Sequence, residues 1–196
     1  MTAEAVSVPP SEPRLLTVAE YVARGETELG YDELVEGRLF MSPSPGPDHN
    51  RAVFRVAVQV EPQLPPELEV LLDLDVDLEL APPDAPGFTR RPDLIFARRS
   101  ARERVRREGG IIRAAEVVVV AEFVSPGSRR TDHVAKRADY ADAGIPHYWI
   151  VDLDDPISLV ACRLGGELGY VDGSAVTGAF ATTEPFAVRL DLGALG

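Results

Sequence analysis

Two apolar segments that each carry a single carboxylate constrain the fold of this chain more than any other feature. Residues 92–96 read Pro-Asp-Leu-Ile-Phe, and residues 117–124 read Val-Val-Val-Val-Ala-Glu-Phe-Val. Runs of β-branched and aromatic residues that are bounded by turn formers predict buried strands. An ionised carboxylate on a buried strand costs several kcal/mol unless a partner compensates it, so Asp93 and Glu122 each require a chemical reason.

A shared divalent cation is the reason that we favour. Hard Mg²⁺ binds carboxylate oxygens, and Mn²⁺ is its natural substitute. We therefore predict Asp93 and Glu122 as metal ligands, with the backbone carbonyl of Phe123 as a further ligand. Two alternatives stay open: Asp93 could hydrogen-bond a turn after Pro92, and Glu122 could pair with an arginine such as Arg91.

Lys136 is the only lysine among the 20 basic residues of the chain. A lysine ammonium is compact, and it can contact a water or a phosphate oxygen where the larger guanidinium of arginine would not fit. Its position after the Glu122 segment predicts a role beside the metal site. The alternative is a solvated helix face that carries a lysine by chance.

The bulk composition suits one globular domain. The chain has 196 residues, of which 45% are hydrophobic, and we expect a disordered tail over residues 1–14 followed by a single domain over residues 15–196. The one cysteine, Cys162, excludes an internal disulfide and favours a cytoplasmic location. No apolar run approaches the roughly 18 residues of a membrane span, so we expect no membrane association.

Charge is unevenly distributed along the chain. The net charge is -12, which argues against nonspecific coating of nucleic acid. Residues 90–137, however, hold 13 basic and 6 acidic residues, so this segment is +7 and the remainder is -19. The basic segment surrounds the two carboxylates and would attract an anionic substrate, unless it forms only an exposed arginine-rich helix.

Periodicity and turn signals predict the other elements. Helices are expected over residues 18–24, behind a Thr17–Glu20 capping box, over 49–61 behind an Asp48 cap, over 100–108, and from a Thr131 or Asp132 cap to about residue 143. Strands are expected on either side of Glu36-Gly37, over 68–80 with one buried face, and over 92–96, 117–124, 147–152, 157–163, 168–172 and 186–190. A turn is expected at residues 125–127. This order predicts a mixed α/β sheet that is flanked by helices and preceded by a helix and a β-hairpin.

Several segments together resemble one known family. They are ELVEG at residues 33–37, MSP at 41–43 with His49, RPDL at 91–94, EFVSPGS at 122–128, Asp132, Lys136, YA at 140–141, and GIPHYWIVD at 144–152. This chain is similar over most of its length, from about Leu15, to the Uma-two family of restriction-endonuclease-like proteins in the PD-(D/E)XK nuclease superfamily. The ordered set is more specific than any one segment.

The resemblance implies a restriction-endonuclease-like α/β core in which Asp93 and Glu122 form the acidic pair and Glu33 lies near them. In the superfamily pattern a lysine stands two residues after the glutamate, where this chain has Val124, so the resemblance assigns that role to Lys136 on the next helix. It also implies that His49 and Tyr148 shape the pocket.

The function expected from these observations is Mg²⁺-dependent hydrolysis of DNA phosphodiester bonds, with Lys136 stabilising the developing charge. Endonucleases of this fold often pair to cut two strands, so a homodimer is an expectation of the resemblance alone. The competing hypothesis is a catalytically inactive protein that kept the fold and binds nucleic acid or a protein partner, which the acidic net charge favours.

Overall fold

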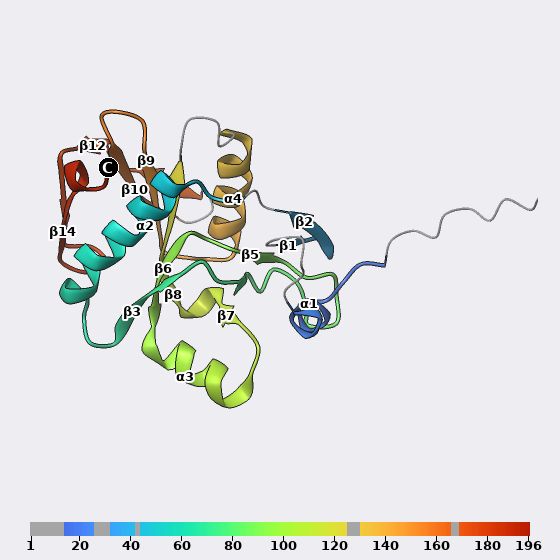
Figure 1. The fold of residues 1–196 in the computed structure, drawn as a ribbon. Helices are drawn as coiled ribbons and strands as arrows, with labels where there is room; N and C mark the ends of the chain where they lie inside the picture. The colour runs from blue at the N-terminus through green and yellow to red at the C-terminus, as the bar shows by residue number, and fades with distance from the viewer. Residues whose placement is uncertain (1–13, 26–31, 42–43, 125–129, 166–168) are drawn as a thin grey trace, which may run out of the picture.

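The fold is built around a mixed sheet, and the central strands of this sheet were predicted from the sequence. The computed structural model describes residues 14–25, 32–41, 44–124, 130–165 and 169–196 (Figure 1). The main sheet has the order β11-β10-β9-β8-β6-β3, and β12 pairs with β10. Its strands are β3 (Leu68–Leu72), β6 (Leu94–Arg98), β8 (Val117–Val124), β9 (His147–Asp152), β10 (Ser158–Leu164), β11 (Tyr170–Asp172) and β12 (Val176–Thr177). The pair β8 and β9 is parallel, and the other pairs are antiparallel.

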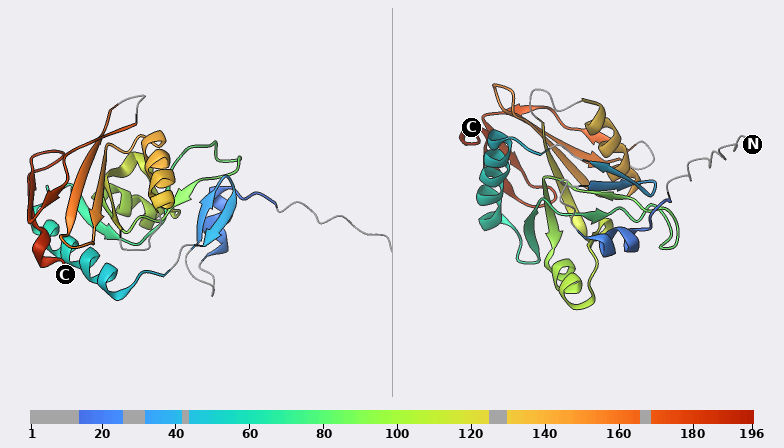
Figure 2. Two further views of the ribbon diagram at one scale, coloured as in Figure 1. Left: turned by 90° about the horizontal axis from the view of Figure 1, so that it is seen from above. Right: turned by 45° about the vertical axis from the view of Figure 1, so that its right-hand side comes forward.

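Both faces of this sheet are covered, which explains its continuous apolar strands. Helix α2 (Pro47–Val60) and the hairpin of β13 (Ala179–Thr182) and β14 (Val188–Asp191) cover one face, where Phe96 and Trp149 pack with Phe186. Helix α4 (Arg130–Asp142) lies on the other face, and Tyr140 packs there beside Tyr148 (Figure 2).

A second, smaller sheet carries the N-terminal hairpin. Its order is β2-β1-β5-β4-β7. The strands are β1 (Asp32–Val35), β2 (Arg38–Met41), β4 (Val76–Asp77), β5 (Thr89–Arg90) and β7 (Ile112–Arg113). The hairpin turn lies at Glu36-Gly37 as predicted, and both residues have positive φ, 50° and 73°, as a type I′ turn requires.

The helices follow the predicted caps with two corrections, one at α2 and one at α4. Helix α1 (Val18–Arg24) begins at the Thr17–Glu20 capping box, and α3 (Arg99–Glu108) ends at Gly109. Helix α2 was predicted to begin after Asp48. It begins at Pro47 instead, because proline suits the first turn, and Gly46 is its N-cap without a side-chain bond. Short 3₁₀ turns lie at η1 (Glu61–Gln63), η2 (Ala114–Glu116) and η4 (Leu192–Ala194).

The predicted strand over residues 68–80 was wrong. It is divided into β3 in the main sheet and β4 in the small sheet. The backbone turns at Asp73, where φ is 48°, and this residue donates its N–H to the carbonyl of Asp93. Neither face of β3 is fully exposed to solvent, because Glu69 is buried and accepts a hydrogen bond from Arg102.

The C-terminal strands were predicted incompletely. The strands expected over 157–163, 168–172 and 186–190 correspond to β10, β11 and β14, but β12 and β13 were not predicted. The expected tail over residues 1–14 lies almost wholly outside the described residues, as does the turn at 125–127. The predicted start of α4 behind a Thr131 or Asp132 cap was wrong, because the helix already includes Arg130 and both residues lie within its first turn. Among the described helices, none is long and apolar enough to cross a membrane.

Candidate functional site

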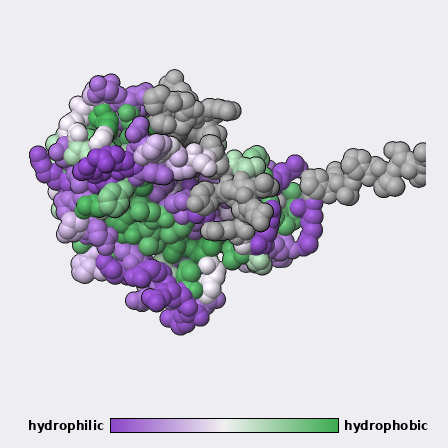
Figure 3. Space-filling view, viewed as in Figure 1, coloured by the Kyte–Doolittle hydropathy of each residue, from purple (hydrophilic) through white to green (hydrophobic). Residues whose placement is uncertain are grey.

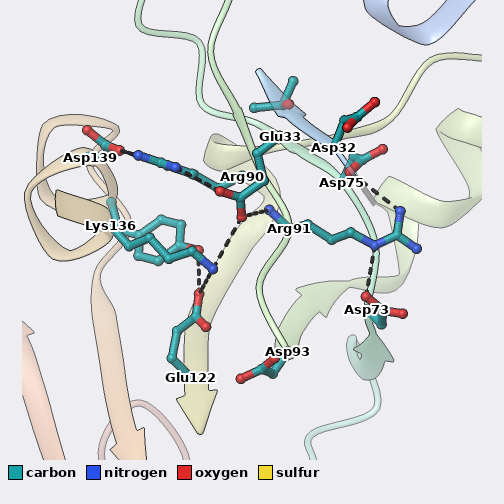
Figure 4. Close-up of polar contacts among 12 residues, drawn as sticks. Asp32, Glu33, Asp73, Asp75, Arg90, Arg91, Asp93, Glu122, Lys136 and Asp139 are labelled. Atoms are coloured by element: carbon teal, nitrogen blue, oxygen red, sulfur yellow. Dashed lines mark hydrogen bonds and ion pairs between the residues drawn. The ribbon is translucent and has the colours of Figure 1, made fainter. Parts of the chain in front are cut away.

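Asp93 and Glu122 lie at adjacent positions, but only Glu122 is within a strand: the strand predicted over residues 92–96 begins at Leu94, so Asp93 lies just before β6. Leu94 in β6 pairs with Ala121 in β8 across an antiparallel ladder. Asp93 immediately precedes Leu94 and Glu122 immediately follows Ala121, so the register brings the two acids next to one another, as predicted (Figure 4). Figure 4 shows the Glu122 carboxyl group pointing toward Lys136.

Glu122 is buried but has polar partners. Its side chain is 4% exposed, and its Oε1 accepts hydrogen bonds from Tyr140 Oη at 2.8 Å and from Lys136 Nζ at 3.1 Å. Burial raises the pKa of Glu122 to about 7, and the nearby charge of Asp93 adds to this effect while Lys136 opposes it. A proton and an ion would therefore compete for this carboxyl group at neutral pH.

Lys136 lies between two acids. Its Nζ is 3.1 Å from Glu122 Oε1 and 3.2 Å from Glu33 Oε1, and its side chain is 16% exposed. Burial favours the neutral amine, yet Glu122 and Glu33 raise the pKa of Lys136 above its ordinary value. The ammonium form is thus held in place, and Lys136 is not a residue on a solvated helix face.

Glu33 connects the small sheet to Asp93, Glu122 and Lys136, and these four residues form the acidic cluster. Its Oε2 accepts a hydrogen bond from Arg90 Nη1 at 2.7 Å, and its Oε1 accepts one from the Arg91 backbone N–H at 3.0 Å. Burial raises the pKa of Glu33, but Lys136 and Arg90 lower it more, so Glu33 is held ionised. Arg90 also donates to Asp139 of α4 at 2.5 and 2.8 Å, which fixes the guanidinium between the small sheet and the helix.

Asp93 is held by α2 and by the backbone of β8. Its Oδ2 accepts the Phe123 backbone N–H at 2.7 Å and lies 3.1 Å from His49 Nε2. Phe123 was expected to offer its carbonyl to a metal ion, and the contact that the structure shows is through its N–H. The hydrogen bond to Asp93 raises the pKa of His49, against the effect of burial.

The basic residues of the segment 90–137 divide between the site and the surface. The Arg91 side chain, which was an alternative partner for Glu122, extends toward Asp73 and donates to it from Nε at 2.8 Å (Figure 4). The arginines of α3 bind other acids, Arg102 with Glu69 and Arg104 with Glu116. Figure 3 shows the hydrophilic surface over α3 at the bottom of the view. Much of the basic segment is therefore a charged helix, while the side chains of Arg90 and Lys136 contact the acidic cluster.

The donor set fits one hard cation that keeps several waters. All hydrogen bonds of Glu122 to described residues use Oε1, and those of Asp93 use Oδ2. The other oxygen of each carboxylate has no hydrogen bond to a residue that the structure describes. No group of three or more His, Cys, Asp or Glu side chains in the described part of the chain has the geometry of a metal site, so an ion here would complete its shell with waters or substrate oxygens, as Mg²⁺ does.

Two residues of the cluster were not predicted. Arg90 gave no signal because it lies in an arginine-rich segment. Tyr140 could have been found, because it lies four residues after Lys136 and therefore on the same helix face. Tyr148, which the resemblance placed at the pocket, is buried behind Tyr140.

Comparisons with known proteins show the family and the fold. A family model described as "Uma2: Putative restriction endonuclease" matches residues 18–180. The chain is also similar to a crystal structure described as a "putative nuclease belonging to DUF820" from Anabaena variabilis, with a TM-score of 0.67 and 19% identity over 92% of this chain and 97% of that chain. No curated protein matches. Because the family model spans most of the sequence, the chain belongs to the Uma2 family of restriction-endonuclease-like proteins.

Proposed function

We propose that this protein is a divalent-metal-dependent endonuclease that hydrolyses phosphodiester bonds of DNA. The observation that carries the proposal is the convergence of Asp93, Glu122 and Lys136, with one oxygen of each carboxylate unused by the described residues. Membership of a nuclease-like family supports a nucleic-acid substrate. Mg²⁺ is the proposed ion, and Mn²⁺ should replace it.

Asp93 and Glu122 would hold the ion, with the carbonyl of Phe123 as a candidate third protein ligand. A bound divalent cation supplies Lewis-acid polarisation of the phosphoryl group and a water of lowered pKa. The His49 and Phe123 N–H contacts hold the Asp93 carboxylate on the β8 side, and the Tyr140 hydroxyl holds that of Glu122.

Lys136 would orient the attacking water and stabilise the negative charge that develops on phosphorus oxygens. The Lys136 ammonium group forms ion pairs with both Glu122 and Glu33. Lys136 is therefore fixed between two carboxylates before substrate arrives. Such prior fixation reduces the reorganisation that the reaction would otherwise require.

A cleavage assay tests this function. Purified wild-type protein should nick supercoiled plasmid with Mg²⁺ or Mn²⁺ and should be inactive with EDTA. Asp93→Ala, Glu122→Gln and Lys136→Ala should each lose at least about 100-fold in rate. The matched control is Glu69→Gln, which alters a similarly buried acid that binds Arg102 outside the site and should leave the rate unchanged.

The inactive binding protein remains the second candidate, because Val124 occupies the position of the superfamily lysine and the net charge is -12. Wild-type protein that binds DNA but does not cleave it with any divalent ion would support that candidate. Cleavage that persists in all three site variants would instead identify a contaminating nuclease.

A further inference from the structure

An exposed aromatic residue stands next to the acidic cluster on the N-terminal hairpin. Phe40 in β2 pairs directly with Glu33 in β1. Residues directly opposite one another in an antiparallel pair have side chains on the same face, with Cβ atoms about 5 Å apart. Glu33 contacts Lys136 through this face, so Phe40 lies on the same face at the edge of the candidate site.

Exposure distinguishes the two members of this pair. Glu33 is 3% exposed, whereas Phe40 is 51% exposed. The Phe40 side chain is half-exposed and belongs to neither of the two clusters of buried core residues. Its exposed ring is available to a ligand that reaches Lys136.

A cation shares this face. Arg38 lies two residues before Phe40 and so points to the same side of β2. It is exposed and makes no ion pair with any other residue that the structure describes. The face of the hairpin thus offers an aromatic ring and a guanidinium beside the candidate site, which matches a nucleobase and a neighbouring phosphate of a nucleic-acid strand.

The negative net charge of the chain increases the relative contribution of a base contact to DNA affinity. Residues 90–137 are +7, but the chain outside them, which includes the hairpin, is -19, so attraction to the phosphate backbone is confined to that segment, and base stacking depends much less on charge. Base stacking also requires an unstacked nucleotide, which single-stranded DNA supplies without a cost of unpairing.

We propose that Phe40 is a substrate-binding residue that stacks on a nucleobase next to the scissile phosphate, with Arg38 on an adjacent phosphate, and that the preferred substrate is therefore single-stranded. This inference rests on the proposed function. It adds the substrate class and names the hairpin face of Arg38 and Phe40 as the surface that recognises it.

Fluorescence anisotropy with labelled oligothymidylate tests the stacking contact. Ca²⁺, which takes the same kind of oxygen ligand, replaces Mg²⁺ in the assay. Phe40→Ala should weaken binding roughly tenfold, and Phe40→Trp should restore it, because stacking of a base on an aromatic ring is commonly worth this much. The matched control is Phe54→Ala, which removes a phenylalanine that is 59% exposed on α2 and should bind as the wild type does.

The same titrations with an abasic oligonucleotide identify the contacted group. Wild type and Phe40→Ala should bind the abasic strand equally, because no base is present to stack. Equal affinity of Phe40→Ala and wild type for oligothymidylate would overturn the stacking contact and leave the proposed function standing. The same loss on the abasic strand would also overturn it.

Two further results would contradict the inference in distinguishable ways. Wild-type protein that binds no oligonucleotide would overturn both the stacking contact and DNA as the substrate. A wild-type dimer that Phe40→Ala converts to a monomer in sedimentation, with DNA affinity unchanged, would show that a second copy of the chain covers Phe40 instead.

Discussion

At the scale of single residues, the described contacts of Asp93 and Glu122 use one oxygen of each carboxylate. Tyr140 and Lys136 occupy Oε1 of Glu122, and His49 and the Phe123 N–H occupy Oδ2 of Asp93. Each acid is oriented by bonds to one oxygen, and no described residue bonds to the other. Outer partners of this kind tune the affinity of a metal site without touching the ion.

Tyr140→Phe tests such a partner. Loss of the hydroxyl removes a hydrogen bond that lowers the pKa of Glu122, so the carboxyl group should hold its proton more firmly and Mn²⁺ affinity should fall roughly tenfold. Calorimetric titration measures the affinity. Tyr170→Phe is the control, because the Tyr170 hydroxyl donates to the Ile145 carbonyl and not to a site residue. Unchanged Mn²⁺ affinity in Tyr140→Phe would exclude the positioning role.

The raised pKa of Glu122 predicts a pH-dependent stability of the metal-free protein. The folded protein holds the Glu122 proton up to about pH 7, whereas the unfolded chain releases it near pH 4.5. Between these values the unfolded state binds fewer protons, so ionisation favours unfolding as pH rises.

Urea unfolding in EDTA should show this trend. Relative to Glu122→Gln, the wild type should lose roughly 1–3 kcal/mol of unfolding free energy between about pH 4.5 and about pH 7.5. A difference between the two proteins that stays constant over this range would show that Glu122 is not buried as a neutral acid.

The sequence predicted the residues that stand out from their surroundings. Asp93 and Glu122 interrupt apolar runs, and Lys136 is the only lysine, so each was visible as an exception. Glu33 was found through the resemblance, since acids are frequent in its segment. Arg90 was hidden because its role depends on a contact with Asp139, 49 residues away, which no local pattern reports.

At the scale of elements, the β1–β2 hairpin is fixed at its turn. Gly37 donates its N–H to the Gly87 carbonyl and accepts the Leu16 N–H. A Cβ added at Gly37 would lie 2.8 Å from Leu15 Cβ and 2.9 Å from Pro86 Cβ. The turn is therefore packed against two segments, and this packing determines where β1 carries Glu33.

Gly37→Ala should lower the unfolding free energy by roughly 2–4 kcal/mol, because the added methyl group meets both the strain of positive φ and a close contact. Gly144→Ala is a matched control: both glycines have φ of 73°, but nothing lies within 4 Å of a Cβ at Gly144. The difference between the two variants in urea unfolding isolates the packing effect. Equal losses would mean that the hairpin turn is not packed against Leu15 and Pro86.

The segment over residues 68–80 shows why element boundaries were harder to predict. Its alternation of apolar and acidic residues continues past the point where the chain leaves the main sheet. Positive φ at Asp73 and Glu79 breaks the strand, and aspartate and glutamate give no clear signal for that conformation. Periodicity reports which residues are buried, but it does not report which sheet buries them.

At the scale of the whole molecule, the candidate site lies where the two sheets meet. Asp93, Glu122 and Lys136 come from the main sheet and its helix α4, while Glu33 and Arg90 come from the small sheet. Arg90 joins the two parts through Glu33 and Asp139. The small sheet is therefore part of the site and positions Lys136 through Glu33.

Arg90→Lys tests this connection. Lysine keeps the charge but cannot reproduce the forked contacts to two carboxylates. Unfolding free energy should fall by about 1–3 kcal/mol, and the cleavage rate should fall while the KM for DNA changes little. Arg102→Lys is the control, since the more exposed Arg102–Glu69 pair should contribute less than about 1 kcal/mol. A cleavage rate equal to that of the wild type would show that the small sheet does not position the site.

The most direct test of a shared ion is a calorimetric titration of Mn²⁺ into wild-type protein, Asp93→Ala, Glu122→Gln and Glu69→Gln at about pH 7.5, where Glu122 is ionised. We expect saturable binding of about one ion to the wild type and to Glu69→Gln, and no saturable heat in Asp93→Ala or Glu122→Gln. Equal heats in the wild type and Asp93→Ala, or no binding to the wild type, would contradict a shared ion between these two acids.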